Sequence, residues 1–191
     1  MVVGVLALQG GFQAHASVLA SLGAEPRPVR TAADLEGVDA LVIPGGESTV
    51  MTLGIEREGL AEPLRDLIEG GTPTLGTCAG MIMLDRAHLG VLDMEVERNA
   101  FGRQLASFET DLDIAGLDGE GPLRAVFIRA PRLPEPSPGV EVLAEVDGHP
   151  VAVRKDHVLA VAFHPELTDD PRVHAWLVEQ VRRRAKEREP A

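Results

Sequence analysis

Cys78, the only cysteine in the chain, stands between Gly76 and Gly80, at the point where one apolar run ends and another begins. Small residues two places before and after a nucleophile permit the sharp strand-to-helix turn called a nucleophile elbow. Free N–H groups at the start of the following helix favour the thiolate, which attacks carbonyl carbons. We therefore interpret Cys78 as a nucleophile. The alternative is a buried structural cysteine, because a free cysteine packs like a small apolar residue.

A cysteine nucleophile needs a base, and the base needs a group that orients it. His164 is the candidate base, because it follows the apolar run 158–162 and so lies at a strand end. Pro165 favours extended backbone at His164, and extended backbone places the side chain of Glu166 on the same side. A carboxylate on one ring nitrogen leaves the other free to accept the thiol proton. The alternative interpretation of this segment is a polar turn that caps a strand.

The remaining histidines have no adjacent elbow and no equally constrained acid, so we expect them to be surface or packing residues. They are His15, His88, His149, His157 and His174. No spacing among the histidines and the single cysteine resembles a structural zinc site, and no metal is expected.

Acyl transfer also needs hydrogen-bond donors for the developing oxyanion. Gly46 lies in a glycine-containing loop, residues 44–49, that follows the apolar run 41–43. Its backbone N–H is one candidate donor, and the N–H of Ala79, the residue after the cysteine, is the other. Because ligands bind at the carboxyl ends of parallel strands, this loop and the elbow would share one edge. The alternative is an ordinary strand-to-helix turn in which Ser48 caps the helix.

The first half of the chain alternates short apolar runs with helical periodicity. Strands are predicted over residues 2–8, 25–29, 40–43 and 74–77. Helices are predicted over residues 12–22 and 48–68, the second broken near Gly59. This alternation is typical of a parallel, doubly wound α/β sheet.

The second half changes to short β-rich segments separated by turn residues, which indicates an antiparallel or mixed region beside the parallel core. The predicted segments are 91–97, 105–109, 123–128, 140–145, 151–154 and 158–162. A last helix is expected after Asp170, with that residue as its cap and Pro171 in its first position.

The composition limits the classes of function. The 191 residues carry a formal net charge of −12, which argues against binding to a nucleic-acid backbone. The basic run 182–188 is interleaved with acids and fits a solvated helix end. The apolar start, residues 1–8, is too short to span a membrane. We expect one domain over residues 1–191 and, with a single cysteine and no signal peptide, a reducing cytoplasm.

Three motifs together resemble class I glutamine amidotransferases: Gly-Thr-Cys-Ala-Gly around Cys78, Pro-Gly-Gly-Glu-Ser over residues 44–48, and His-Pro-Glu over residues 164–166. The resemblance implies a single-domain, flavodoxin-like fold. It also implies a Cys78–His164–Glu166 triad that hydrolyses the side-chain amide of L-glutamine through a γ-glutamyl thioester. No cofactor is implied.

Four segments are similar to the glutaminase subunits of pyridoxal 5′-phosphate synthase: residues 4–10, 44–49, 97–104 and 127–131. The resemblance runs from residue 3 to about 176. It implies that residues in these segments bind glutamine or frame its pocket, namely Gly46, Glu47, Ser48, Arg98, Ile128 and Arg129. A guanidinium suits the substrate carboxylate, although sequence does not decide which arginine contacts it. The alternative for both arginines is a surface ion pair.

The same resemblance implies a protein partner. Glutaminases of this kind pass ammonia to a synthase subunit that resembles a TIM barrel, and twelve of them decorate a twelve-membered core. Gln9 ends the first predicted strand, near the loop at Gly46, in a region that meets the synthase. We therefore expect the free subunit to have an incomplete oxyanion hole, with Gln9 linking docking to the loop.

Two other functions stay open at this point. One is a glutaminase subunit that serves another biosynthetic pathway, because the triad is common to the class. The other is a non-catalytic subunit that keeps the fold and regulates its partner. A cysteine peptidase or redox-sensing protein with a similar elbow is a more distant alternative, because such proteins do not usually need a His-Pro-Glu segment near the carboxyl end.

Overall fold

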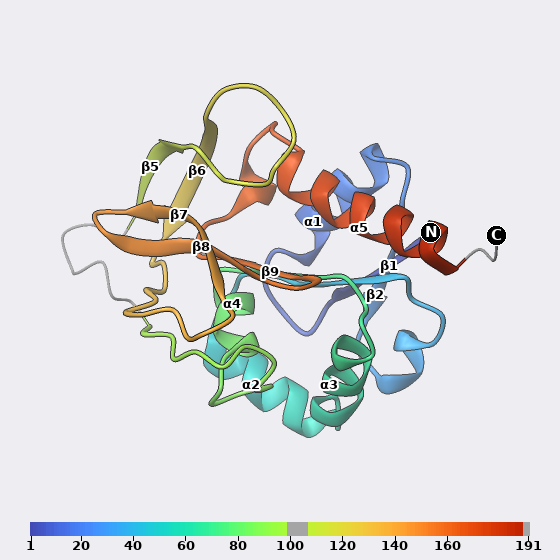
Figure 1. The fold of residues 1–191 in the computed structure, drawn as a ribbon. Helices are drawn as coiled ribbons and strands as arrows, with labels where there is room; N and C mark the ends of the chain where they lie inside the picture. Colours follow the sequence, from blue (N-terminus) through green and yellow to red (C-terminus); the bar gives the residue numbers. More distant parts are fainter. Residues whose placement is uncertain (99–106, 189–191) are drawn as a thin grey trace.

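The computed structural model describes residues 1–98 and 107–188, and it is built around one seven-stranded sheet (Figure 1). Five strands are parallel: β1 (Val2–Leu6), β2 (Glu25–Val29), β3 (Ala40–Ile43), β4 (Thr74–Thr77) and β9 (Val158–Val161). The order is β2-β1-β3-β4-β9-β8-β7. Strands β3, β4 and β9 are buried along their whole length, as expected for a parallel sheet covered on both faces.

Helices cover both faces of this sheet. On one face lie α1 (Phe12–Ser21) and α5 (Arg172–Arg188), and on the other lie α2 (Ser48–Arg57), α3 (Ala61–Glu69) and α4 (Ala79–Leu84) (Figure 1). Two 3₁₀ turns, η1 (Ala32–Leu35) and η2 (Pro165–Leu167), complete the connections. The predicted doubly wound α/β fold is confirmed, including the break near Gly59 between α2 and α3.

The antiparallel additions lie at one side of the parallel core. Strands β7 (Glu141–Val146) and β8 (His149–Lys155) extend the main sheet, and β5 (Ser107–Leu112) pairs with β6 (Leu123–Ile128) in a separate ribbon. Phe127 of the ribbon stacks on Phe108 at 4.5 Å between ring centroids and lies 5.6 Å from Phe163. This aromatic contact joins the ribbon to the chain just before His164.

One predicted strand needs correction. Residues 91–97 are not a strand. Alternate side chains there, Leu92, Met94 and Val96, are buried, which produced the strand-like pattern. Backbone groups of Leu92 and Met94 bond to Leu84 and Arg86 around the end of α4, and among the described residues the segment makes only an isolated antiparallel bridge, from Glu97 to Arg132. Strand β9, predicted within the antiparallel or mixed half, joins the two parts of the sheet, because it is parallel to β4 and antiparallel to β8. The predicted strand start at Leu105 lies outside the described residues.

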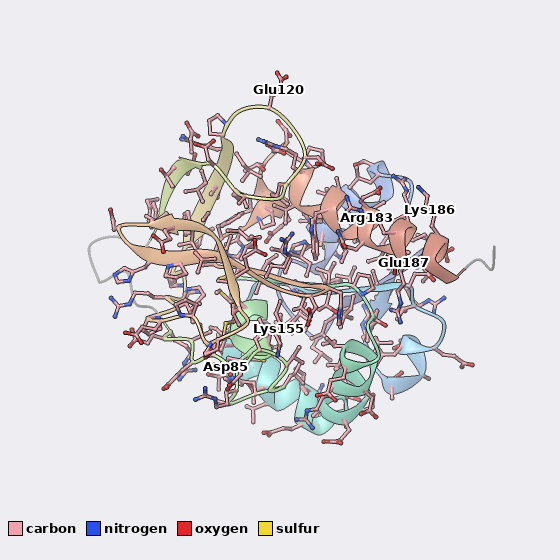
Figure 2. All side chains as sticks on the ribbon, in the orientation of Figure 1. Asp85, Glu120, Lys155, Arg183, Lys186 and Glu187 are labelled. Atoms are coloured by element: carbon pink, nitrogen blue, oxygen red, sulfur yellow. The ribbon has the colours of Figure 1, made fainter. Side chains whose placement is uncertain are left out.

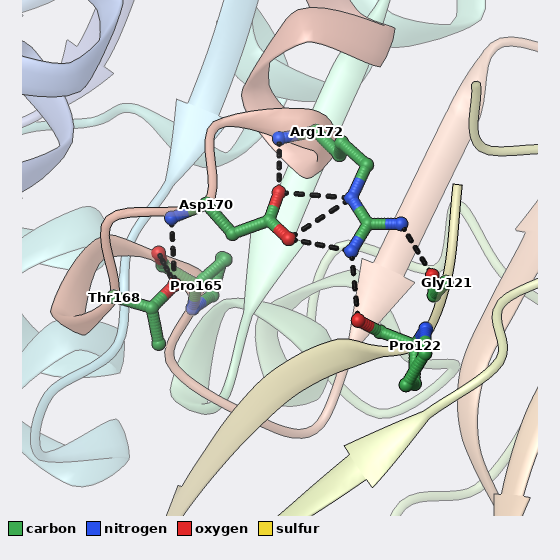
Figure 3. Close-up of polar contacts among 6 residues, drawn as sticks. All are labelled: Gly121, Pro122, Pro165, Thr168, Asp170 and Arg172. Atoms are coloured by element: carbon green, nitrogen blue, oxygen red, sulfur yellow. Dashed lines mark hydrogen bonds and ion pairs between the residues drawn. The ribbon is translucent and has the colours of Figure 1, made fainter. Parts of the chain in front are cut away.

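The helix α5 begins at Arg172, one residue later than predicted, so Pro171 precedes its first position, while Asp170 still bonds to its first backbone N–H and the helix is tied to the ribbon (Figure 3). Asp170 Oδ1 accepts the backbone N–H of Arg172 at 3.0 Å, and its carboxylate also pairs with the guanidinium of that arginine. The same guanidinium donates to the carbonyls of Gly121 and Pro122, at 2.8 and 3.0 Å. The segment between β5 and β6 is thereby fixed to the helix that follows the His-Pro-Glu motif.

Charged side chains lie over the outside of the molecule. Arg183, Lys186 and Glu187 project from the outer side of α5, and Glu120 stands at the tip of the loop before β6 (Figure 2). Arg183 lies within 3.5 Å of Glu179 one turn earlier, so part of the basic run is paired within its own helix. None of the described helices is long and apolar enough to cross a membrane.

Candidate active site

Cys78 occupies a strained turn between β4 and α4, with φ 48° and ψ −107°. Positive φ is unfavourable for a side chain with a Cβ, and such strain is concentrated at functional sites. The flanking glycines are sterically required. A Cβ on Gly80 would lie 1.9 Å from the carbonyl oxygen of Ile43, and one on Gly76 would lie 2.8 Å from that of Gly80. The elbow therefore has the geometry that its sequence predicts, with α4 beginning at Ala79.

His164 lies at the end of β9, where its backbone N–H bonds to the carbonyl of Val126 at 2.8 Å. Its Nδ1 lies 2.7 Å from Glu166 Oε1. A carboxylate only accepts, so Nδ1 carries the proton and Nε2 is left for Cys78. The contact differs from our expectation in one respect: the chain is not extended through Glu166, because Pro165 begins η2.

Opposing effects set the charges of this pair. Burial alone would lower the pKa of His164, but hydrogen bonds with Cys78 and Glu166 raise it to about 10. Burial would raise the pKa of Glu166, yet the hydrogen bond from His164 holds it below its ordinary value. The side chain of Glu166 is 2% exposed. These effects favour a protonated His164 beside an ionised Glu166.

The loop after β3 closes over the elbow. A Cβ on Gly45 would lie 2.5 Å from Cε1 of His164 and 3.2 Å from Cβ of Cys78, so only glycine fits there. Gln9 Nε2 donates to the carbonyl of Glu47 at 2.9 Å. The predicted linking residue and the predicted oxyanion loop are thus in direct contact.

The structure shows which of Glu47 and Ser48 caps α2. The cap of α2 is Glu47 rather than Ser48: its carboxylate accepts the N–H groups of Thr49 and Val50, at 3.1 and 2.9 Å. These bonds lower the pKa of Glu47. Because the Glu47 carboxylate is bonded to α2, a contact of Glu47 with a ligand would use its backbone groups. Ser48 is buried, with its hydroxyl 3.4 Å from Arg98.

The two predicted arginines and Ile128 line the same cavity. Among the described residues, Arg98 donates to the hydroxyls of Thr49 and Ser48 and to no carboxylate. Arg129 has φ 46°, so the chain turns sharply as it leaves β6. The carbonyl oxygen of Ile128 lies 3.9 Å from Cys78 Sγ.

These groups surround a cavity of about 330 Å³, a size that suits a small-molecule substrate. All predicted catalytic and substrate-binding residues contribute to its wall, and Gln9 contacts one of them, Glu47, without lining the cavity itself. The lining residues are Gly11, Gly45, Gly46, Glu47, Ser48, Cys78, Ala79, Ile82, Arg98, Ile128, Arg129, His164, Glu166 and Leu167.

Two histidines that we expected at the surface or in ordinary packing lie directly behind Glu166. His15 and His174 are both 0% exposed and contact each other through Nδ1 and Nε2 at 2.8 Å. Nε2 of His15 lies 3.3 Å from Glu166 Oε2. A signal was present in the sequence: each histidine falls on the apolar stripe of its helix, three residues from Phe12 or Leu177. Across residues 1–98 and 107–188, no cluster of three or more acidic, histidine or cysteine side chains suits a metal ion.

Comparison with known proteins agrees with this geometry. The model of the SNO glutamine amidotransferase family matches residues 5–183. The chain belongs to that family. It is 54% identical, over 96% of its length and 95% of the relative's, to the pyridoxal 5′-phosphate synthase subunit PdxT of Acidothermus cellulolyticus. It is 48% identical to the protein of the same name from Corynebacterium jeikeium, over 98% and 100% of the two chains.

Solved structures agree with the family assignment. A crystal structure of a glutamine amidotransferase superposes with a TM-score of 0.89 at 47% identity, covering 95% of this chain and 99% of that one. A putative GMP synthase subunit from Thermoplasma acidophilum shares the fold at 18% identity and a TM-score of 0.74, covering 99% and 98%. The fold is therefore the flavodoxin-like fold of class I glutamine amidotransferases.

Proposed function

We propose that this amidotransferase is the glutaminase subunit of a pyridoxal 5′-phosphate synthase, with Cys78, His164 and Glu166 as its catalytic triad. One observation carries the catalytic part: a strained cysteine elbow faces a histidine held 2.7 Å from a buried carboxylate, beside a cavity of about 330 Å³. The pathway rests on the relatives, which are named as subunits of that synthase.

In the proposed reaction, the Cys78 thiolate attacks the side-chain carbonyl carbon of L-glutamine. The oxyanion receives hydrogen bonds from the backbone N–H groups of Ala79 and Gly46. His164 gives its Nε2 proton to the departing nitrogen, the C–N bond breaks, and ammonia leaves a γ-glutamyl thioester. Water then gives His164 a proton and attacks the thioester, the C–S bond breaks, and glutamate is released.

The cavity wall supplies groups suited to an amino acid. The guanidinium of Arg98 or Arg129 would pair with the α-carboxylate of glutamine. Ser48, Ile128 and the backbone of Glu47 would frame its side chain. Arg98 is already oriented by the hydroxyls of Ser48 and Thr49, which favours it as the direct contact.

The proposed partner is a synthase subunit with a TIM-barrel fold. A sealed path to that subunit makes chemical sense, because ammonia released into water would be lost and mostly protonated. The proposed assembly has twelve copies of each subunit, in a reducing cytoplasm that keeps the Cys78 thiol free. Docking would act through the contact of Gln9 with the Glu47 carbonyl and reorient the backbone at Gly46.

Glutamate release from glutamine tests this proposal. We would assay the protein alone, then with the pyridoxal 5′-phosphate synthase subunit, and use Cys78→Ala as the control. Strong stimulation that the variant lacks is the expected result. Cys78-dependent activity that ignores this synthase would assign the chain to another biosynthetic pathway, and no Cys78-dependent activity in either condition would favour a regulatory subunit.

A further inference from the structure

A buried polar chain continues from Glu166 away from the cavity. Glu166 Oε1 bonds to His164, whereas Oε2 lies 3.3 Å from Nε2 of His15 and has no hydrogen bond of good geometry among the described residues. The same Nε2 lies 3.1 Å from Oγ1 of Thr77, at the end of β4. His174 of α5 contacts the other ring nitrogen of His15 at 2.8 Å.

The positions of the protons on the two histidines decide which group donates in each of these hydrogen bonds. If Nδ1 of His15 carried the proton, the Nε2 lone pair would face the carboxylate oxygen of Glu166, and the contact would be repulsive. Nδ1 of His174 would then carry a buried N–H without a partner, since that atom has no hydrogen bond. Unpaired buried N–H groups are rarer than unpaired acceptors. The favoured arrangement has His174 Nε2–H donating to His15 and His15 Nε2–H shared between Thr77 and Glu166.

Both histidines are neutral donors at neutral pH. Burial lowers the pKa of His15 to about 4 and that of His174 to about 3. A neutral donor can hold Oε2 without cancelling the charge of Glu166. A lysine or arginine in its place would compete with His164 for that charge.

The helix α1 supports the carboxylate at two positions on one face. A Cβ on Gly11 would lie 3.1 Å from Glu166 Oε1, and His15, four residues later, approaches Oε2. One oxygen therefore faces the tightly packed start of the helix and the other faces His15.

We propose that His15, held by His174, is a positioning residue that fixes the Glu166 carboxylate so that Oε1 stays on Nδ1 of His164. The inference rests on the proposed triad. Since His15 does not line the cavity but contacts Glu166, it should affect the chemical step and leave glutamine binding unchanged.

The test compares His15→Leu with His15→Gln in the complex with the synthase subunit. Leucine removes the donor, whereas the glutamine amide can place an N–H near the position of Nε2. We expect His15→Leu to lower kcat by about tenfold to a hundredfold, as for other partners that orient a functional side chain, with KM changed less than about twofold. His15→Gln should recover most of kcat. His157→Leu is the matched control, because that histidine bonds at 2.7 Å to the carbonyl of Ile68, outside the site.

An unchanged kcat in His15→Leu would overturn the inference, as would equal losses in the leucine and glutamine variants. If His15→Leu does not fold, His174→Leu is the deciding variant. A kcat at least about threefold lower, with KM and the unfolding temperature unchanged, supports the inference. An unchanged kcat overturns it. Failure of the proposed function would look different, because the wild-type complex would then release no glutamate that depends on Cys78.

Discussion

The triad region and the β5–β6 ribbon both contain ionic contacts, but in opposite surroundings. Around Glu166 the ionic contacts are almost fully buried: the side chains of His15, Glu166 and His164 are 0%, 2% and 12% exposed. On the ribbon, Arg124 lies 3.0 Å from Glu109 and 3.2 Å from Asp111, and all three side chains are more than half exposed. Burying a charge is costly unless it is paired, whereas exposed pairs contribute little. The buried contacts belong to the proposed triad and the groups behind it, whereas the exposed contacts lie on the surface of the ribbon.

The largest expected effect is at the elbow. Cys78→Ala removes the proposed nucleophile and should lower glutamate release by the complex at least about 10⁴-fold, as in other nucleophile deletions. Circular dichroism should show an unchanged fold, since alanine fits the same turn. Substantial activity in this variant would contradict the role of the buried region in catalysis.

Loss of the buried carboxylate should come next. Glu166→Gln leaves an amide where His164 needs a charged acceptor, and we expect kcat to fall about 10³-fold. The matched control is Glu141→Gln, which alters an exposed pair with Arg154 and should leave kcat unchanged.

The same variant tests the charge of His164. Its pKa is raised to about 10, so the stabilisation that its charge provides is present below about pH 6.5 and is lost as pH rises through 10. Glu166→Gln should bring the pKa back toward 6.5, so that this loss begins at lower pH. Nitrogen NMR of labelled histidines would measure the change, and an unmoved titration would contradict it.

The next prediction concerns packing at the elbow. Gly80→Ala places a methyl group 1.9 Å from the carbonyl oxygen of Ile43 and should lower the free energy of unfolding by about 3 kcal/mol, about a hundredfold in the folding equilibrium. Gly148→Ala, in the open β7–β8 turn, is the control, with a loss of about 1 kcal/mol from its φ of 75° alone. Urea unfolding measures both, and equal losses would contradict the steric argument.

A smaller effect is expected where the site meets its proposed partner. Gln9→Ala removes the hydrogen bond to the Glu47 carbonyl and should lower synthase-stimulated glutamate release by about fivefold, with less than about twofold loss of basal activity. Gln13→Ala, on the exposed side of α1, should change neither. Equal losses of stimulated and basal activity would count against a link to docking.

The smallest effect should come from the ribbon. Arg124→Ala removes contacts to Glu109 and Asp111 that water and salt already weaken. The unfolding temperature should shift by less than about 2 °C, and kcat should not change. A large loss of activity would show that the ribbon and the triad are coupled, contrary to the comparison above.

Much of the fold could be predicted because its signals are local. The bounds of β2, β3, β4 and β6 equal those expected from sequence. For β3 and β4 the reason is that a buried parallel strand is a short, solvent-inaccessible segment between turn residues. The strand predicted over residues 91–97 failed because alternation reports which side chains are buried and not whether a neighbouring strand is available. Pairing is a property of the whole sheet.

The sequence by itself determined the elbow at Cys78, the His164–Glu166 pair and the alternation of strands and helices. Each depends on residues only a few positions apart, where glycine and proline restrict the backbone directly. Only the tertiary structure decided that Glu47 caps α2 and that His15 and His174 stand behind Glu166. Those histidines are 159 positions apart and meet because α1 and α5 cover the same face of the sheet. A histidine on an apolar stripe has no assigned partner until the opposing helix is packed against it.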